Sequence, residues 1–135
     1  MNHILSPDTG DAAIEREILA KGLTAPRVTP ADVEAAIDSE HYFTAGMGVL
    51  GAAQWGAVKV EIEGGNWGVQ SSLDTLTFCV LTLKNGFTVT GESACASLEN
   101  FNYEIGKKIA RENAKNKIWA LLGFMLKEKL AGEVA

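Results

Sequence analysis

Residues 76–119 read LTFCVLTLKNGFTVTGESACASLENFNYEIGKKIARENAKNKIW, and this stretch decides the fold. Leu76 to Leu83 is rich in apolar and β-branched residues and predicts a strand. Asn85–Gly86 is the signature of a two-residue type I′ turn, after which Phe87 to Ser93 returns as a second strand. The stretch therefore predicts a tight antiparallel hairpin that leads almost directly into a long helix.

The register of this hairpin follows from the length of its turn. A two-residue turn predicts the opposing pairs Lys84–Phe87, Thr82–Val89 and Leu81–Thr90. In that register one face holds Phe78, Val80, Phe87 and Val89, and the other holds Cys79, Leu81 and Leu83. A strand that is apolar on both faces is usually central in its sheet or covered on both sides.

The segment after the hairpin predicts one helix, capped by Ser97 and ending near Leu130. Its apolar residues form two stripes on nearly opposite sides. The first stripe is Leu98, Phe101, Ile105, Ile109, Trp119, Leu126 and Leu130, and the second is Ala110, Ala114, Ile118, Leu121 and Met125. Two stripes need two burial partners. One is the chain's own sheet; the other is a second subunit or, as the alternative, the N-terminal helices.

The N-terminal half predicts two helices and a glycine-rich stretch. Asp11 to Lys21 repeats apolar residues at helical spacing and ends at Gly22. Thr29 caps a second helix that continues to Tyr42 or Phe43. Residues 44–75 contain half of the 14 glycines, and alternation around Gly64–Gly65 predicts another hairpin within them. We expect one α+β domain, with antiparallel hairpins packed on a long C-terminal helix and short N-terminal helices.

Residues 46–51, GMGVLG, match the GxGxxG pattern of dinucleotide-binding folds. That fingerprint needs a strand before it and a helix after it, whereas here a predicted helix precedes it. We therefore interpret these residues as a loop. Trp55 and Trp67 lie in or beside glycine-rich segments, where an aromatic ring either packs on the protein or stacks on a nucleobase.

Charge is distributed unevenly along the chain. The net charge is −5, with 11 acids and 4 bases in residues 1–74 but 6 acids and 8 bases in residues 75–135. Lys107, Lys108, Arg111 and Lys115 fall within an arc of about 100° on the long helix. Such an arc is either an anion site, most naturally for phosphates, or a solvated face paired with Glu104 and Glu112. The residues alone favour the solvated face.

Several classes of protein are disfavoured by the sequence. Two widely spaced cysteines and two histidines make a poor set of zinc ligands, so we expect no bound metal and no cofactor. Ser93 and Cys95 have no evident base partner, so we expect that the protein is not an enzyme. No apolar run is long enough to span a membrane. The acidic first half argues against DNA binding. We expect a reduced, cytoplasmic protein.

Five stretches of the sequence carry a resemblance to a known family. They are residues 29–43, 77–95, 99–101, 105–114 and 117–119. They read TPADVEAAIDSEHYF, TFCVLTLKNGFTVTGESAC, ENF, IGKKIARENA and KIW. This pattern resembles the small phage protein family typified by gene 49 of phage N4 and gene 66 of phage Sf6. It implies a single domain, residues 1–135, with residues 1–28 as an N-terminal helix and linker before a family core from residue 29.

The sequence is also similar to the Thoeris anti-defence sponge proteins, which bind a cyclic ADP-ribose signal and hold it without cutting it. This resemblance implies a phage anti-defence protein that sequesters a cyclic nucleotide in the host cytoplasm. The ligands that it implies are a cyclic ADP-ribose isomer and cyclic oligonucleotides. It also implies a homodimer or a hexamer (a trimer of dimers). It implies Arg111 and Lys115 as phosphate ligands, with Lys107 and Lys108 beside them and Asn85, Phe87, Glu92 and Ser93 as further ligand residues. The alternatives are a non-enzymatic phage interaction or assembly protein and, third, a DNA-binding regulator.

Overall fold

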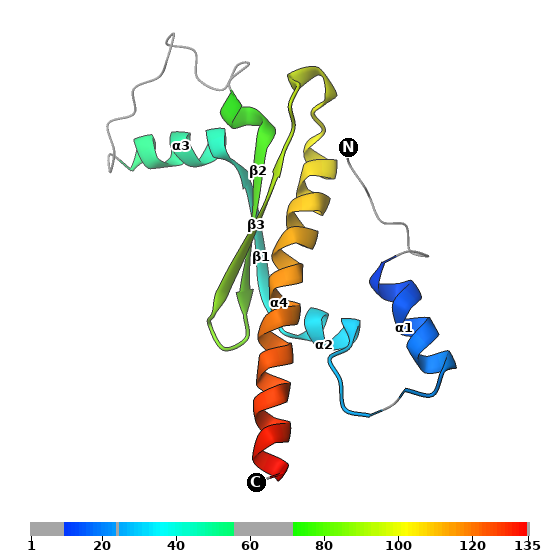
Figure 1. Cartoon of the computed structure of the whole chain (residues 1–135). Helices are drawn as coiled ribbons and strands as arrows, with labels where there is room; N and C mark the ends of the chain where they lie inside the picture. The colour runs from blue at the N-terminus through cyan, green and yellow to red at the C-terminus, as the bar shows by residue number, and fades with distance from the viewer. Residues whose placement is uncertain (1–9, 24, 56–71, 135) are drawn as a thin grey trace.

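The computed structural model describes residues 10–23, 25–55 and 72–134. Three antiparallel strands form one sheet in the order β1 (Ile37–Thr44), β2 (Leu76–Leu83) and β3 (Thr88–Ala94). The long helix α4 (Tyr103–Val134) crosses one face of this sheet and extends beyond it (Figure 1). This arrangement confirms the α+β fold. The other elements are α1 (Asp11–Ala20), α2 (Pro30–Ala35), α3 (Ala45–Gln54) and the 3₁₀ turns η2 (Ser72–Thr75) and η3 (Leu98–Asn100).

The two strands of the hairpin lie where the sequence predicts them, but the predicted register is wrong by one residue. Leu81 pairs with Val89 and Thr82 pairs with Thr88. The turn contains three residues, because Gly86 N–H donates to Leu83 O at 2.8 Å and Gly86 has a φ of 90°. A type I turn followed by a left-handed glycine is the usual three-residue solution. Val89 therefore shares the face of Leu81 and Cys79, and both strands present this face to α4.

The predicted helix from Thr29 to Phe43 is wrong in its second half. Its start is confirmed, since Thr29 Oγ1 accepts from Asp32 N–H and an Asp32 carboxylate oxygen accepts from Thr29 N–H. The helix ends after only six residues, and Ile37–Thr44 pairs with β2 as strand β1. Backbone pairing with a strand some forty residues away outweighs the weak local preference for helix.

The interpretation of residues 46–51 as a loop is also wrong. They lie inside α3, which is capped by Thr44 Oγ1 accepting from Met47 N–H at 3.1 Å. A strand does precede this helix, but the sheet is antiparallel, so the dinucleotide-binding arrangement of parallel strands is absent from the described residues. Trp55 follows α3 and is 88% exposed. The hairpin predicted around Gly64–Gly65, with Trp67, lies outside the described residues.

The long helix begins later than predicted. Ser97 makes no capping bond, and the residues after it form the short turn η3. Asn102 takes the capping role instead, because its Oδ1 accepts from Ile105 N–H at 3.1 Å. From there α4 runs 32 residues to Val134. In the described residues, none of the helices combines the length and apolar character needed to cross a membrane.

The core lies between α4 and the sheet, and small residues allow the two layers to approach closely. Gly106, Ala110, Ala114 and Ile118 are buried on the side of α4 that faces Cys79, Leu81, Leu83 and Val89. Val33 of α2 completes this cluster. The second predicted stripe therefore packs on the chain's own sheet from Ala110 to Ile118, whereas Met125 at its end is 59% exposed. The first stripe remains half-buried or exposed at all its residues, so its proposed second subunit stays a prediction.

Thr77 carries the least favourable polar group of this core. Its side chain is fully buried, and its Oγ1 has no hydrogen-bond partner in the described part of the chain. Replacing Thr77 by valine is expected to stabilise the fold by about 1 kcal/mol, because it removes an uncompensated hydroxyl. Thermal denaturation followed by circular dichroism measures this change.

Thr44 provides the matched control for Thr77→Val. It is also a buried threonine, at 5% exposure, but its Oγ1 caps α3. Thr44→Val is therefore expected to destabilise by about 1 kcal/mol, opposite in sign. A loss of stability at both positions would contradict the assignment of Thr77 as an unsatisfied group.

Candidate functional site

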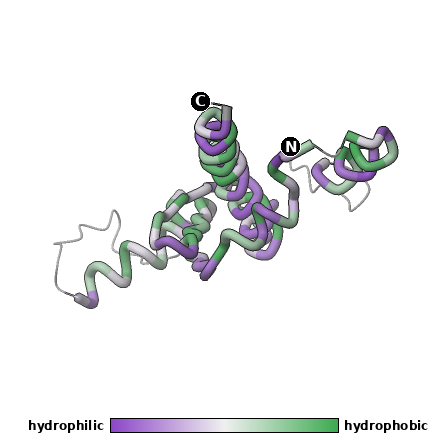
Figure 2. Tube along the Cα trace, turned by 90° about the horizontal axis from the view of Figure 1, so that it is seen from below, coloured by the Kyte–Doolittle hydropathy of each residue, from purple (hydrophilic) through white to green (hydrophobic). Residues whose placement is uncertain are grey.

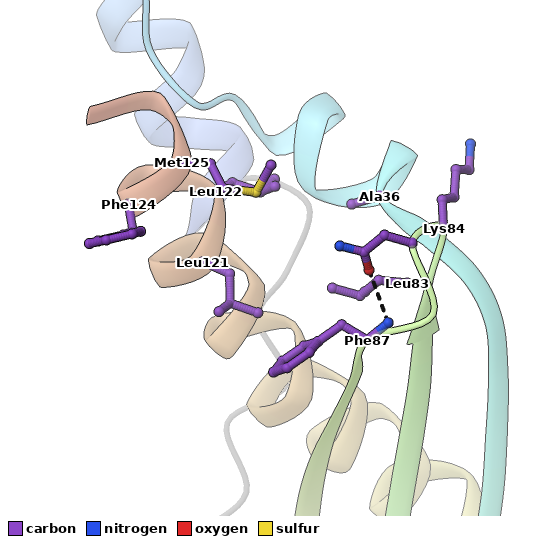
Figure 3. Close-up of a pocket in the computed structure, with 9 residues that line it drawn as sticks. Ala36, Leu83, Lys84, Phe87, Leu121, Leu122, Phe124 and Met125 are labelled. Carbon is purple, nitrogen blue, oxygen red and sulfur yellow. Dashed lines mark hydrogen bonds between the residues drawn. The ribbon is translucent and has the colours of Figure 1, made fainter. Parts of the chain in front are cut away.

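A pocket opens where the hairpin turn, the end of α2 and the C-terminal half of α4 meet (Figure 3). Its volume is about 340 Å³, and most of its lining is aliphatic or aromatic. The lining residues are Ala36, Leu83, Lys84, Asn85, Phe87, Leu121, Leu122, Phe124 and Met125. A largely apolar hollow of this size with a few polar groups is typical of small-molecule sites.

The pocket exists because α4 is much longer than the strands. A helix of 32 residues spans about 48 Å, whereas an eight-residue strand spans about 27 Å. The last turns of α4 therefore pass beyond the sheet, and their apolar side chains are only partly covered. Met125 is 59% exposed and Phe87 is 54% exposed, although both are apolar.

The hairpin turn supplies the polar groups of the pocket. Asn85 Oδ1 accepts from Phe87 N–H at 2.9 Å, a bond drawn as the dashed line in Figure 3. This bond uses the amide oxygen, so Nδ2 is the part of Asn85 suited to bind a ligand. Lys84 N–H donates to Ala36 O at 3.0 Å and fixes the turn to the end of α2. The Lys84 side chain itself is exposed.

The predicted phosphate ligand Arg111 lies in a different place, inside an ion cluster that joins α4 to α2 and β1. Its guanidinium donates two hydrogen bonds to Glu34, at 2.7 and 3.1 Å, and two to Glu40, at 3.1 and 3.2 Å. Lys115 Nζ lies 3.3 Å from Glu34 and 3.0 Å from Glu112. Three carboxylates therefore surround two cations, and an external anion would have to displace one of them.

These contacts shift the pKa values of four groups, Glu34, Glu40, Arg111 and Lys115. The bonds from Arg111 lower the pKa of Glu34 and of Glu40 below the usual carboxyl value, and burial opposes both shifts. The same bonds, led by those to Glu34, raise the pKa of Arg111 further. Burial lowers the pKa of Lys115, but bonds to Glu112 and Glu34 outweigh it and leave the pKa raised. All four groups are consequently charged at neutral pH.

Four further predicted site residues lie neither in the pocket nor in the ion cluster. Lys107 Nζ pairs with Glu104 at 3.0 Å and lies over the rings of Tyr42 and Tyr103, while Lys108 is exposed. Glu92 and Ser93 lie on β3, at the opposite edge of the sheet from β1. Of the eight predicted residues, the structure brings only Asn85 and Phe87 to the pocket.

Sequence reasoning missed most of the pocket walls. Leu121 and Met125 were assigned to a buried stripe, and Leu83, Leu122 and Ala36 were not considered as site residues. One signal was available, because the predicted helix was too long for eight-residue strands to cover. That mismatch alone indicates an overhanging apolar end beside the hairpin turn.

Comparison with known proteins places the chain in a family. No curated protein and no solved structure gives a significant match. The family description "Phage protein (N4 Gp49/phage Sf6 gene 66) family" matches residues 28–130, which include β1 to β3 and most of α4. The match begins just before α2 and covers the ion cluster and the pocket. The chain therefore belongs to the phage protein family of N4 Gp49 and Sf6 gene 66.

Proposed function

We propose that this phage protein binds a cyclic nucleotide immune signal, such as a cyclic ADP-ribose isomer, and holds it without breaking any bond. It would act in the host cytoplasm by mass action, since a bound signal is not available to its effector. Such a sponge needs a tight site and molar excess over the signal, but no catalytic group. Membership of the phage family and the resemblance of the sequence to anti-defence sponges support this proposal.

The single observation that carries this proposal is the open apolar pocket with an aromatic wall. Phe87 offers a ring on which a nucleobase can stack, and Leu121 and Leu83 provide apolar surface around it. Asn85 Nδ2 is placed to donate to a base or ribose oxygen. Lys84 also belongs to the lining, and its exposed ammonium, which points away from the cavity in Figure 3, is suited to a phosphate that projects into solvent. An adenine base thus has both a stacking surface and polar partners here.

Phe87→Ala is expected to weaken binding of the cyclic nucleotide by about 5- to 150-fold, because stacking on one base contributes about 1–3 kcal/mol. Titration calorimetry with cyclic ADP-ribose isomers measures the loss. Trp55→Ala is the control, since Trp55 is an even more exposed aromatic residue at the end of the sheet away from the hairpin turn. Equal effects at Phe87 and Trp55, or none at Phe87, would remove the pocket from the proposal.

The fate of the ligand separates a sponge from an enzyme. The protein is loaded with the cyclic nucleotide, freed of excess ligand, and denatured by heat. Chromatography of the supernatant is expected to recover the cyclic nucleotide intact. Recovery of linear ADP-ribose would instead indicate hydrolysis.

A second function, a phage interaction or assembly protein, is favoured by one observation. Phe124 and Met125 are 68% and 59% exposed on the same overhanging turns of α4. Large apolar side chains exposed together often mark a protein contact. Light scattering after size exclusion tests for a dimer or a trimer of dimers, and a thermal-shift screen tests for the ligand. An oligomer whose melting temperature is unchanged by millimolar cyclic nucleotides would favour assembly over sequestration.

A further inference from the structure

Helix α1 buries little of its surface against the rest of the described chain, although its Glu15 pairs with Arg27. In Figures 1 and 2, viewed at right angles, it stands apart from the sheet and α4. None of its residues is buried, and Ile14 and Leu19 are 57% and 56% exposed. Leu23, just after the helix, is 57% exposed. An amphipathic helix with its apolar side in solvent lacks the burial that normally stabilises short helices.

The sequence nevertheless gives α1 a well-defined end. Gly22 N–H donates to Leu19 O at 3.1 Å, and Leu23 N–H donates to Ile18 O at 3.2 Å. With Gly22 at a φ of 70°, this pair of bonds is the Schellman ending of a helix. It places Leu23 beside Ile18, in line with Ile14 one turn earlier. Ile14, Ile18 and Leu23 thus form a preformed apolar stripe.

The chain connecting α1 to the core is long enough to bring this stripe to the pocket. Val28 packs against the core and Ala36 lines the pocket, so the attachment point lies beside it. Helix α2 between them is only about 9 Å long, and residues 21–29 can extend to about 30 Å. Helix α1 also precedes residue 28, where the family match begins. It therefore lies outside the residues that the family model matches.

The two surfaces are complementary in character. The pocket exposes Phe87, Phe124 and Met125, and the stripe of α1 is aliphatic. Residues 11–21 carry three acids and two bases, and the pocket lining in the described chain includes the cation Lys84. Covering exposed apolar surface is favourable at about 25 cal/mol per Å², and the charges do not oppose it.

We infer that α1 is a lid, which moves relative to the core and lays Ile14, Ile18 and Leu23 over the pocket of its own chain. The observed structure is the open state. A clasp holds it there, since Arg27 donates to both carboxylate oxygens of Glu15, at 2.6 and 2.7 Å. The lid rests on the pocket of the proposed function but not on the identity of the ligand, so it is tested without any nucleotide.

A disulfide trap tests the closed state. Leu23→Cys and Met125→Cys are combined with Cys95→Ser, which removes the half-buried native thiol, and the dilute protein is oxidised gently. Peptide mass spectrometry is expected to find an intrachain bond at roughly five times the yield of the control pair Leu23→Cys and Thr90→Cys. Thr90 is exposed on the sheet face away from α4. Adding Glu15→Gln opens the clasp and is expected to speed the trapping.

Two outcomes of the trap would overturn the inference: no excess over the Thr90 control, or bonds formed only between chains. The latter would mean that α1 covers a second copy. A rate unchanged by Glu15→Gln would overturn the clasp.

Oxidation of methionine tests the same lid in a chain with no added cysteine. Ile14→Asp weakens the apolar stripe, so dilute peroxide is expected to oxidise Met125 roughly threefold faster than in the unmodified protein. Met47, 50% exposed on α3, provides the internal reference and should keep its rate. Equal rates at Met125 in both proteins would overturn the lid even if the cysteine variants failed to fold.

Discussion

Gly91→Ala is expected to destabilise this protein by about 3 kcal/mol or more, the largest effect of any single methyl group in the described chain. A Cβ on Gly91 would lie 2.2 Å from Ala110 O and 2.3 Å from Ala114 N. Both are backbone atoms of α4, so no side-chain rotation can relieve the clash, and the helix must separate from the sheet. Thermal denaturation should show a melting temperature lowered by roughly 10 °C or more.

Gly123→Ala is the matched control for Gly91→Ala. Gly123 lies within α4 and has nothing within 4 Å of its added Cβ, so alanine there gains helix propensity without a clash. It is expected to stabilise the protein by about 0.5–1 kcal/mol. A Gly91→Ala protein as stable as the unmodified chain would show that α4 does not pack on β3 at this distance.

Arg111→Ala is expected to remove about 1–2 kcal/mol of stability at neutral pH, because Glu34 and Glu40 lose the cation they share. The figure is well below that of a fully buried pair, since the two carboxylates are 47% and 39% exposed. Arg111 holds the pKa of both carboxyls below the unfolded value of about 4.3. Their contribution is therefore complete above that pH and is lost as the pH falls through the lower, folded pKa. Urea denaturation between neutral pH and pH 3 should show this acid loss in the unmodified protein and a smaller one in Arg111→Ala.

Neutralising the two acids separates this structural role of Arg111 from ligand binding. Adding Glu34→Gln and Glu40→Gln to Arg111→Ala should recover part of the lost stability, because no uncompensated charge remains. If the loss of stability at low pH is the same in Arg111→Ala as in the unmodified protein, Arg111 does not set the pKa values of Glu34 and Glu40. In the otherwise unmodified chain, Glu34→Gln frees part of Arg111 and Lys115. If their cations bind the phosphates of a nucleotide, calorimetry should then show tighter binding.

The local signals of this sequence predicted the elements that depend on near neighbours. Strand β2 has the predicted bounds, and Thr29 caps the second helix as predicted. The first helix ends at Ala20, one residue before the predicted Lys21. Each of these features is decided within about five residues by turn geometry, side-chain capping or alternation. The hairpin turn was located correctly, but Asn85–Gly86 fits both a two-residue and a three-residue turn. Only the pairing along the whole length of β2 and β3 selects the three-residue turn.

The candidate site was less predictable, because its residues meet only through the fold. Sequence placed Arg111 and Lys115 on one helical arc, but it could not reveal that β1 brings Glu40, and α2 brings Glu34, to the same guanidinium. It therefore could not distinguish a free cation from a paired one. Asn85 and Phe87 were predicted as lesser ligand residues, and the structure makes them part of the pocket wall.

By itself, the sequence determined an α+β chain with a hairpin, a long two-striped helix and a basic arc, because propensity, capping and periodicity act over a few residues. The tertiary structure decided three other matters. It converted residues 37–44 from helix to strand through pairing with β2, it neutralised Arg111 through two distant acids, and it left the end of α4 overhanging the sheet as one wall of a pocket. Each depends on contacts between residues far apart in the chain, whose free energies exceed the small local preferences that a sequence displays.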